Sequence, residues 1–206
     1  MTSQDLALIE FLGSTGLVIT AEQAARWYYK TKTPKGSINK ARRRLLYLTT
    51  KKMPELKRAQ IYRGPYVYYH KKNPTNLVHA LMATEFLSRL SAVYEPLSIN
   101  KEFQGLLKGY NTRPDLYVVV QGRSERLGIL VECENSKTFN KKEEYKQIIG
   151  ARKNNQLKDI LPYRTLIVVV DKKDPEINGI SWIDKDYKNF DKWLKYIVGK
   201  YGVEGD

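Results

Sequence analysis

The stretch that decides the fold is residues 37–48, SINKARRRLLYL, which is followed at residues 60–69 by QIYRGPYVYY. In the first run, apolar residues recur at helical spacing, at Ile38, Ala41, Leu45 and Leu48. This spacing predicts a helix with one buried face. In the second run, Arg63-Gly64-Pro65 interrupts strand-forming residues, so the run predicts a β-hairpin that turns at this point.

Positive charge is concentrated around this stretch. Residues 1–72 hold 15 Lys and Arg against 4 Asp and Glu, whereas residues 73–206 hold 21 against 18. Such a local excess attracts a polyanion, because binding releases the condensed counterions of the polyanion. Anionic lipid is the alternative partner. A membrane-binding helix would expose large apolar groups opposite its cations, however, and here the apolar stripe is better explained as core.

The residues before this stretch predict two more helices, at about 4–12 and 21–29. Thr20 is a good N-cap for the second helix, with Gln23 as its capping-box partner. Ser37 is the expected cap of the third helix, which runs to about residue 50. Three helices followed by a two-stranded wing are typical of a winged helix-turn-helix domain, which we assign to residues 1–72.

In a winged helix-turn-helix, the start of the third helix reads base edges in the major groove. No more than two of the three consecutive arginines 42–44 can reach that groove, because neighbouring helix positions are about 100° apart. Arg63 at the wing tip would enter a minor groove, and the remaining cations would contact phosphate. The alternative is a solvated basic face. The expected DNA-binding residues are Lys35, Ser37, Asn39, Lys40, Arg42, Arg43, Arg44, Lys51, Lys52, Lys57, Arg58 and Arg63.

Residues 73–206 predict a second domain of mixed helices and strands. The expected helices cover about 75–90, 140–159 and 185–201, and the expected strands 96–103, 116–120, 127–132, 165–170 and 180–182. The order is α-β-β-β-α-β with C-terminal additions. The strand-helix-strand segment from 127 to 170 should form a parallel crossover. The fold class is therefore α+β or α/β.

Three carboxylates stand at the ends of two predicted strands in this domain: Asp115, Glu132 and Glu134. A hairpin turn near residues 123 and 124 would place residue 115 opposite residue 132, where like charges repel. A divalent cation, a nearby Lys or Arg, or a raised pKa must relieve that repulsion. Three oxygen ligands suit Mg²⁺ or Mn²⁺. The alternative is simple ion pairing with neighbours such as Arg113, Lys137, Lys141 and Lys142.

The element order, with Pro114-Asp115 on one strand and Glu132-x-Glu134 on the next, resembles the PD-(D/E)xK (restriction-endonuclease-like) core. The resemblance implies that Asp115, Glu132 and Glu134 are candidate catalytic and metal-binding residues. This chain departs from the family pattern, because Glu134 stands where a water-activating lysine is expected. Lys137 or Lys146 would then be a migrated substitute. The departure favours a degenerate domain without cleavage.

The whole chain resembles the replication-relaxation family of plasmids and other mobile elements. The matching pieces are Thr20-Ala21-Glu22-Gln23-Ala24-Ala25, Ala41-Arg42-Arg43-Arg44-Leu45, Gly64-Pro65-Tyr66-Val67-Tyr68, Leu77-Val78-His79-Ala80-Leu81, Arg113-Pro114-Asp115, Val131-Glu132-Cys133-Glu134 and Tyr145. The resemblance implies a DNA-binding protein with a winged helix and a degenerate nuclease-like domain. It also implies a role in plasmid replication, or in mobilisation (conjugation) beside a relaxase in a relaxosome.

The sequence lacks the features of disulfide-rich, zinc-binding, membrane-spanning and exported proteins. One cysteine excludes an intrachain disulfide framework, and with only two histidines a structural zinc site is not expected. No apolar run is long enough to span a bilayer and no export signal is visible, so we expect a cytoplasmic protein without a membrane partner.

We therefore expect a double-stranded DNA-binding accessory or initiator protein that needs no cofactor for DNA binding. A relaxase or replication protein is its expected partner. A homodimer is also expected, because a single winged helix provides little sequence specificity. Two alternatives stay open. One is a Mg²⁺-dependent endonuclease targeted by the winged helix, and the other is a transcriptional regulator.

Overall fold

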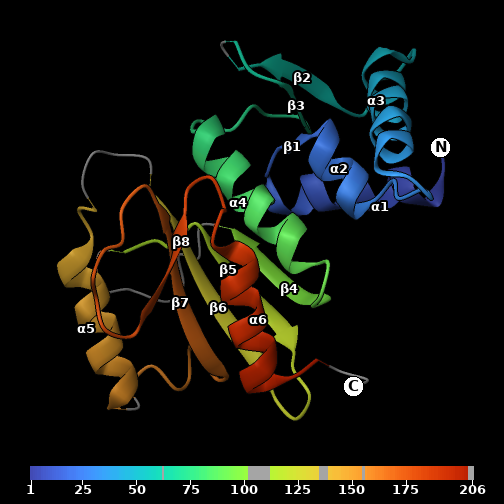
Figure 1. Ribbon diagram of the computed structural model, residues 1–206. Coiled ribbons are helices and arrows are strands. Elements are labelled where there is room, and N and C mark those ends of the chain that lie inside the picture. The colour runs from blue at the N-terminus through green and yellow to red at the C-terminus, as the bar shows by residue number, and fades with distance from the viewer. Residues whose placement is uncertain (62, 102–111, 135–138, 155, 204–206) are drawn as a thin grey trace. The chain divides into compact units, whose positions relative to one another are not determined.

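The computed structural model describes residues 1–61, 63–101, 112–134, 139–154 and 156–203. It shows a mixed α+β chain that divides into two compact units, Met1–Ala92 and Val93–Asp206 (Figure 1). The boundary that we expected after residue 72 therefore lies further along the chain. The reason is helix α4 (Leu77–Leu90), which packs on α2 (Ala21–Trp27) inside the N-terminal unit.

The N-terminal unit combines four helices with a small antiparallel sheet whose strand order is β1-β3-β2. Its remaining elements are α1 (Ser3–Thr15), β1 (Ile19–Thr20), α3 (Pro34–Thr50), β2 (Lys57–Gln60) and β3 (Tyr66–Tyr69). The expected hairpin is thus present as β2 and β3. Strand β1 was not expected, because two residues are too few to show an alternating pattern.

Local capping explains where the helices of this unit begin. Thr20 and Gln23 form the expected capping box at the start of α2. Helix α3 begins earlier than expected, because the side chain of Thr33 caps it and Pro34 occupies its first turn, where a missing N–H costs nothing. Ser37 is consequently not a cap. It lies buried in the first turns of α3, and its hydroxyl donates to the Thr33 carbonyl.

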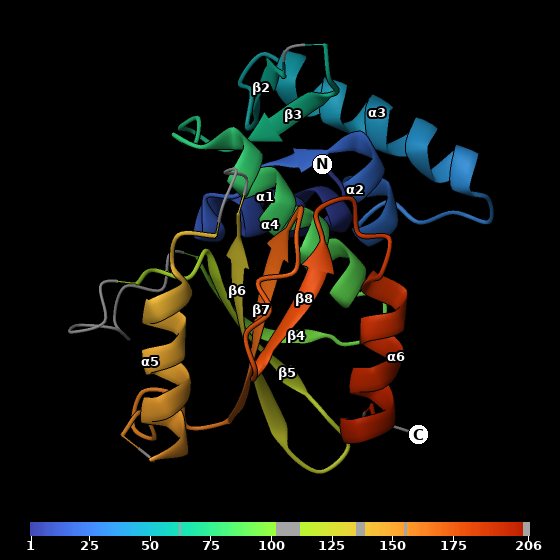
Figure 2. The same ribbon diagram turned by 60° about the vertical axis from the view of Figure 1, so that its left-hand side comes forward.

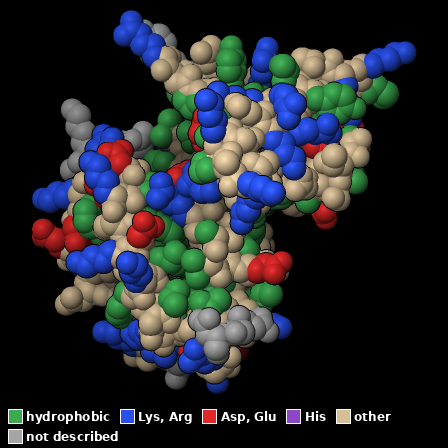
Figure 3. All heavy atoms as spheres, turned by 45° about the vertical axis from the view of Figure 1, so that its right-hand side comes forward, with side chains coloured by type: hydrophobic (Ala, Val, Ile, Leu, Met, Phe, Trp, Pro, Cys, Tyr) green, Lys and Arg blue, Asp and Glu red, His purple; other side chains and the backbone are tan. Residues whose placement is uncertain are grey.

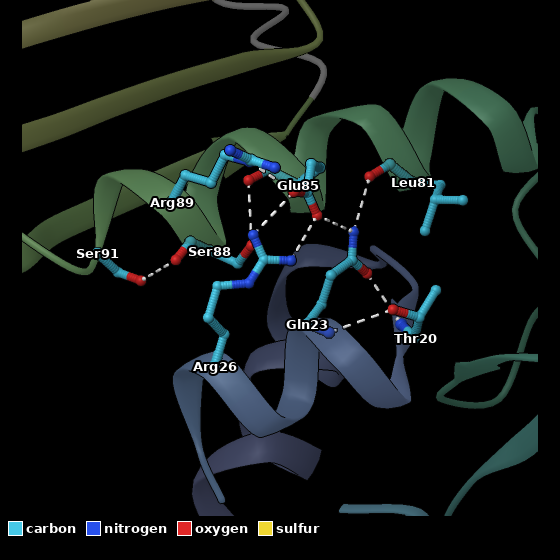
Figure 4. A network of polar contacts seen from close by, with 8 residues as sticks. All are labelled: Thr20, Gln23, Arg26, Leu81, Glu85, Ser88, Arg89 and Ser91. Atoms are coloured by element: carbon cyan, nitrogen blue, oxygen red, sulfur yellow. Dashed lines mark hydrogen bonds and ion pairs between the residues drawn. The ribbon is translucent and has the colours of Figure 1, made fainter. Parts of the chain in front are cut away.

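A polar network joins α4 to α2 (Figure 4). Both terminal nitrogens of the Arg26 guanidinium group pair with the carboxylate of Glu85, at 2.8 and 3.0 Å. The amide of Gln23 donates to the same carboxylate at 3.1 Å, and Arg89 donates to it at 2.6 Å. Burial acts to raise the pKa of Glu85, but the contacts with Arg26, Arg89 and Gln23 together outweigh it, so the net shift is downward. Gln23 therefore serves two purposes, since it also caps its own helix.

The C-terminal unit contains a five-stranded sheet of order β4-β5-β6-β7-β8. Its strands are β4 (Pro96–Lys101), β5 (Leu116–Gln121), β6 (Arg126–Cys133), β7 (Arg164–Asp171) and β8 (Ile180–Asp184), and its helices are α5 (Lys142–Lys153) and α6 (Phe190–Tyr201). The first three strands run antiparallel, whereas β6, β7 and β8 are parallel. Helices α5 and α6 lie on opposite faces of the sheet (Figure 2).

Gly128 of β6 stands where a side chain would collide with residues of both neighbouring strands. A Cβ atom at this position would lie 2.6 Å from the Tyr117 hydroxyl of β5 and 2.8 Å from Oγ1 of Thr165 in β7. The side chains of the two flanking strands therefore fill the space above Gly128. Tyr117 also packs with Leu130 and Tyr145 in the core between the sheet and α5.

Across the described ranges, none of the helices is both long and apolar enough to cross a bilayer. The longest, α3, is strongly cationic on its outer face and buries only one stripe of its surface.

Candidate functional site

The exposed face of α3 carries four of the twelve residues expected to bind DNA. Lys35, Asn39, Arg42 and Arg43 are exposed. Of the expected apolar stripe, Ala41, Leu45 and Leu48 are buried and Ile38 is half-buried. These four exposed positions share one side of the helix because their spacing follows its turns. On the N-terminal unit, Figure 3 shows Lys and Arg side chains (blue) over much of the face drawn and few Asp or Glu side chains.

Arg42 is exposed and only weakly engaged within the chain. Its side chain is 62% exposed, and its ion pair with Glu22 of α2 spans 3.3 Å between two exposed groups. An exposed pair of this kind contributes little to stability, so it can be exchanged for a phosphate or a base at small cost.

Arg44 has a different role from the one that we expected. Its guanidinium group pairs with Asp5 of α1 through two nitrogens, and Asp5 also accepts a hydrogen bond from the Tyr29 hydroxyl at 2.8 Å. Asp5 is fully buried. Burial acts to raise the pKa of Asp5, but the hydrogen bonds from Arg44, Thr2 and Tyr29 outweigh it and hold that pKa well below its usual range. Arg44 therefore anchors α3 to α1.

Three other expected contacts are also engaged inside the N-terminal unit. Lys40 donates to the Gln4 side chain at 2.9 Å, and Lys51 pairs with Glu55 at 3.0 Å. Ser37 is buried, and its hydroxyl accepts from the backbone N–H of Thr31 at 2.8 Å. These contacts tie the three side chains to neighbouring residues of the N-terminal unit, and none of the three is as exposed as Arg42 or Arg43.

The β2–β3 hairpin presents a second group of cations. Lys57, Arg58 and Arg63 are exposed, as is Lys52 just before the hairpin. The Arg58 guanidinium lies 5.0 Å from the centroid of the Tyr66 ring, which orients it along the outer surface of the hairpin. Arg63 adopts a left-handed backbone conformation with φ of 52°, so the turn falls where the sequence predicted it. Tyr62 lies outside the described residues.

In the C-terminal unit, Asp115 and Glu132 come together as the register predicted. Leu116 pairs with Val131, which places residue 115 opposite residue 132. Asp115 Oδ2 accepts a hydrogen bond from the backbone N–H of Cys133 at 2.7 Å.

Both carboxylate oxygens of Glu132 are bonded to side chains at the start of α5, one from its N-cap residue and one from within the helix. Lys141 Nζ lies 2.6 Å from Oε1, and the Tyr145 hydroxyl donates to Oε2 at 2.9 Å. Glu132 is only 1% exposed. Burial, followed by the charge of Asp115, raises the pKa of Glu132 to about 7, although Lys141 and Tyr145 act in the opposite direction. The repulsion between the two carboxylates is therefore relieved by an ion pair and a raised pKa.

Glu134 lies at the end of β6 beside a different acidic residue. Its backbone N–H donates to the Val170 carbonyl at 2.8 Å, next to Asp171. Burial raises the pKa of Asp171, and the charge of Glu134 raises it further. Among the residues that the structure describes, no group of three or more His, Cys, Asp or Glu side chains is placed to hold a metal ion. The expected three-carboxylate ligand set is therefore not assembled there.

The lysine that reaches Glu132 is neither of the two expected substitutes. Lys137 lies outside the described residues, and Lys146 is exposed and pairs with Glu143 at 2.7 Å. Lys141 and Tyr145 are four positions apart, so they share one side of the polypeptide as it enters α5. That spacing, in the helix after the acidic strand, was the available signal for this contact.

Comparisons with protein-family models, with curated proteins and with solved structures find no significant match to this chain. Function is therefore inferred below from the placement of these side chains, together with the sequence resemblance described above.

Proposed function

We propose that this chain binds double-stranded DNA through the exposed face of α3 and the β2–β3 hairpin. The single observation that supports this most is the set of exposed polar and cationic side chains on α3, of which Arg42 and Arg43 are the most strongly basic. Guanidinium groups bond guanine in a bidentate way, and an amide such as that of Asn39 bonds adenine. Cations on the hairpin, such as Lys57 and Arg58, would contact the phosphate backbone.

The same geometry divides the basic residues of α3 into two groups. Arg42, Arg43 and Lys35 are assigned to DNA. Arg44 and Lys40 are assigned to holding α3 on α1, because their polar atoms are already bonded to Asp5 and Gln4. A loss of DNA binding after substitution of Arg44 would therefore come from loss of structure.

The test is fluorescence anisotropy with labelled duplex DNA at low salt. We expect the double substitution of Arg42→Ala and Arg43→Ala to weaken binding by about a hundredfold, since each contact contributes on the order of 1–3 kcal/mol. The matched control replaces Lys192 and Lys195, two exposed cations of α6, by alanine. Equal effects of the two double substitutions would show that only net charge matters and would refute the assignment to α3.

The biological setting that we propose is the replication or mobilisation of a plasmid or another mobile element, beside a relaxase or replication protein. This part of the proposal depends on the sequence resemblance. Its test is to measure plasmid copy number and conjugation frequency with the wild-type chain and with the Arg42/Arg43 variant. Unchanged values for both quantities, in cells where the variant no longer binds DNA, would exclude this role.

A second candidate function is Mg²⁺-dependent cleavage of DNA by the C-terminal unit. It is favoured by the pairing of Asp115 with Glu132 beside Lys141, a set of groups that hydrolysis can use. It is disfavoured because Lys141 and Tyr145 occupy both oxygens of Glu132. Incubation of supercoiled and linear DNA with Mg²⁺ or Mn²⁺ tests it. Cleavage that disappears in Asp115→Asn and Glu132→Gln would establish this activity.

A further inference from the structure

We propose that the C-terminal unit binds a phosphate monoester in a pocket at the start of β7. The pocket has a volume of about 240 Å³ and lies where the chain passes from the end of α5 into β7. Three cationic side chains line it: Arg152, Lys158 and Arg164. No acidic side chain is among the described residues that line it.

Arg152 is the central residue of this proposal. It is half-buried, and within the described ranges of the chain its guanidinium group makes no hydrogen bond or ion pair. Burial lowers the pKa of Arg152; Tyr201 acts against this effect, and the charge of Arg164 adds to it. A cation that has lost part of its hydration without gaining a partner is unfavourable, and a bound anion removes this cost.

The position of Arg152 near the end of α5 offers another explanation, because cations stabilise the negative end of a helix. That explanation accounts better for Lys153, which is exposed at the same end. The last carbonyls of the helix already have backbone partners. Gly150 accepts from the N–H of Asn154, and Ala151 accepts from the N–H of Gln156. Arg152 is therefore not needed to cap the helix.

Arg164 is available to the same anion. Its contact with Glu125 is long, at 3.7 Å, and joins two side chains that are 53% and 46% exposed, so it is weak. Its guanidinium carbon lies 5.1 Å from the centroid of the Tyr201 ring, which fixes the direction of the side chain. Lys158 adds an exposed ammonium group to the rim.

These three cations suit a phosphate monoester better than a carboxylate. A monoester carries about −1.5 to −2 charges at pH 7 and offers three acceptor oxygens, whereas a carboxylate carries one charge and two oxygens. Guanidinium forks bond two phosphate oxygens at once. The buried side chains of Leu157 and Leu161 form part of the pocket wall.

Two sources can supply this chemistry: a small phosphorylated molecule and the 5′-phosphate of a nucleic acid strand. The first experiment uses inorganic phosphate as the probe, in isothermal titration calorimetry of the full chain at constant ionic strength. We expect Arg152→Gln and Lys158→Gln each to weaken phosphate binding by about tenfold, the value of one hydrogen bond to a charged group. Lys153→Gln, which removes a charge next to Arg152 but outside the pocket, should leave it unchanged.

Absence of phosphate binding at millimolar concentration, or equal losses in Lys153→Gln and Arg152→Gln, would overturn the proposal. Lys158 is exposed, so Lys158→Gln keeps the test valid even if Arg152→Gln fails to fold. A second readout is pH. Binding of inorganic phosphate should weaken as the pH falls from about 8 to about 5, because the ligand takes up a proton and loses its second charge in this range.

The second experiment separates the two sources, in the Arg42→Ala and Arg43→Ala background that suppresses binding at α3. A single strand with a 5′-phosphate is compared with the same strand ending in a hydroxyl. Tighter binding of the phosphorylated strand, lost in Arg152→Gln, supports a strand end. Equal binding of the two strands, with inorganic phosphate still bound, supports a small phosphorylated ligand. Neither result depends on DNA binding by α3.

Discussion

Neighbouring arginines on α3 have opposite roles. The chain places Arg43 in solvent and Arg44 against a buried carboxylate, although the two residues are adjacent in sequence. Adjacent helix positions point in different directions, so one arginine faces outward while the next faces α1. A basic run in a helix is thus not a uniform surface, and each of its side chains needs its own test.

Replacing Arg44 by alanine should destabilise the protein by about 3 kcal/mol, because it leaves the buried charge of Asp5 without its main partner. Urea denaturation at pH 7 measures this loss. Arg43→Ala, the exposed neighbour, should change stability by less than about 0.5 kcal/mol. The native pKa of Asp5 is depressed, so the difference between Arg44→Ala and the wild type should persist down to about pH 4 and shrink only below it. Equal stability of the two variants would contradict the role of this pair.

Glu132 should make the stability of the folded chain fall as pH rises, which is opposite to the effect of Asp5. Its pKa is raised to about 7 in the folded chain, so between about pH 4.5 and 7 the folded state keeps a proton that the unfolded state releases. Stability should therefore fall across this window as pH rises, by about 3 kcal/mol. Glu132→Gln should remove that dependence, and Glu143→Gln, an exposed control on α5, should retain it. A parallel pH profile for wild type and Glu132→Gln would refute the raised pKa.

At the scale of elements, α4 belongs to the N-terminal unit through contacts that its own sequence does not reveal. Its apolar spacing predicts a helix with a buried face, but it does not indicate which neighbour covers that face. The bond between Arg26 and Glu85 joins residues that are 59 positions apart. Thr84 adds a hydrogen bond to the Val18 carbonyl at 2.6 Å. Pairing over such distances follows from tertiary packing, which is why the boundary was predicted too early.

Glu85 is the residue on which the attachment of α4 depends most. Glu85→Ala should destabilise the N-terminal unit by about 3 kcal/mol, because it leaves Arg26, Gln23 and Arg89 without their shared acceptor in a half-buried place. Thermal denaturation followed by circular dichroism measures the loss. Glu10→Ala, an exposed carboxylate on α1, is the control and should be close to neutral. A neutral Glu85→Ala would show that apolar contacts alone hold α4.

Several elements could be predicted from sequence because their signals are local. The buried face of α3 follows from the spacing of Ala41, Leu45 and Leu48, and the start of α2 follows from Thr20 and Gln23. The start of α3 was predicted too late, because Pro34 and Gly36 are typical of a turn as well as of a first helical turn.

The contacts of the carboxylates in the C-terminal unit also divide into one that could be predicted from sequence and one that could not. The pairing of residue 115 with residue 132 was predictable, since the position of a tight turn fixes the register of a hairpin. The spacing of Lys141 and Tyr145 indicates that they share one side, but the contact with Glu132 also depends on how α5 packs on the sheet, which that spacing does not encode.

For the whole molecule, the division at Ala92 makes a prediction about fragments. A fragment of residues 1–92 should fold cooperatively and bind duplex DNA, whereas residues 1–72 should not fold, because they lack α4 and its buried side chains such as Phe86 and Leu87. Urea denaturation followed by circular dichroism distinguishes the two fragments. Cooperative folding of 1–72 would place the boundary where the sequence first indicated it.

The uneven charge of the whole molecule predicts a steep salt dependence of DNA binding. If the N-terminal unit neutralises about five phosphates, the slope of log K against log salt concentration should be about −4 to −5. The variant with Arg42→Ala and Arg43→Ala should show a slope shallower by up to about 2. Anisotropy titrations across a range of salt concentrations measure both slopes. A flat dependence would exclude binding through phosphate.

The close approach at Gly128 has a consequence for how this protein can vary. Every other amino acid would push against the Tyr117 hydroxyl and Thr165 at once, on two different strands. In a saturation library that is selected for folded protein, position 128 should return only glycine unless residue 117 or 165 shrinks in the same clone. A compensating pair of that kind, recovered without any knowledge of the coordinates, would independently identify which three strands lie side by side.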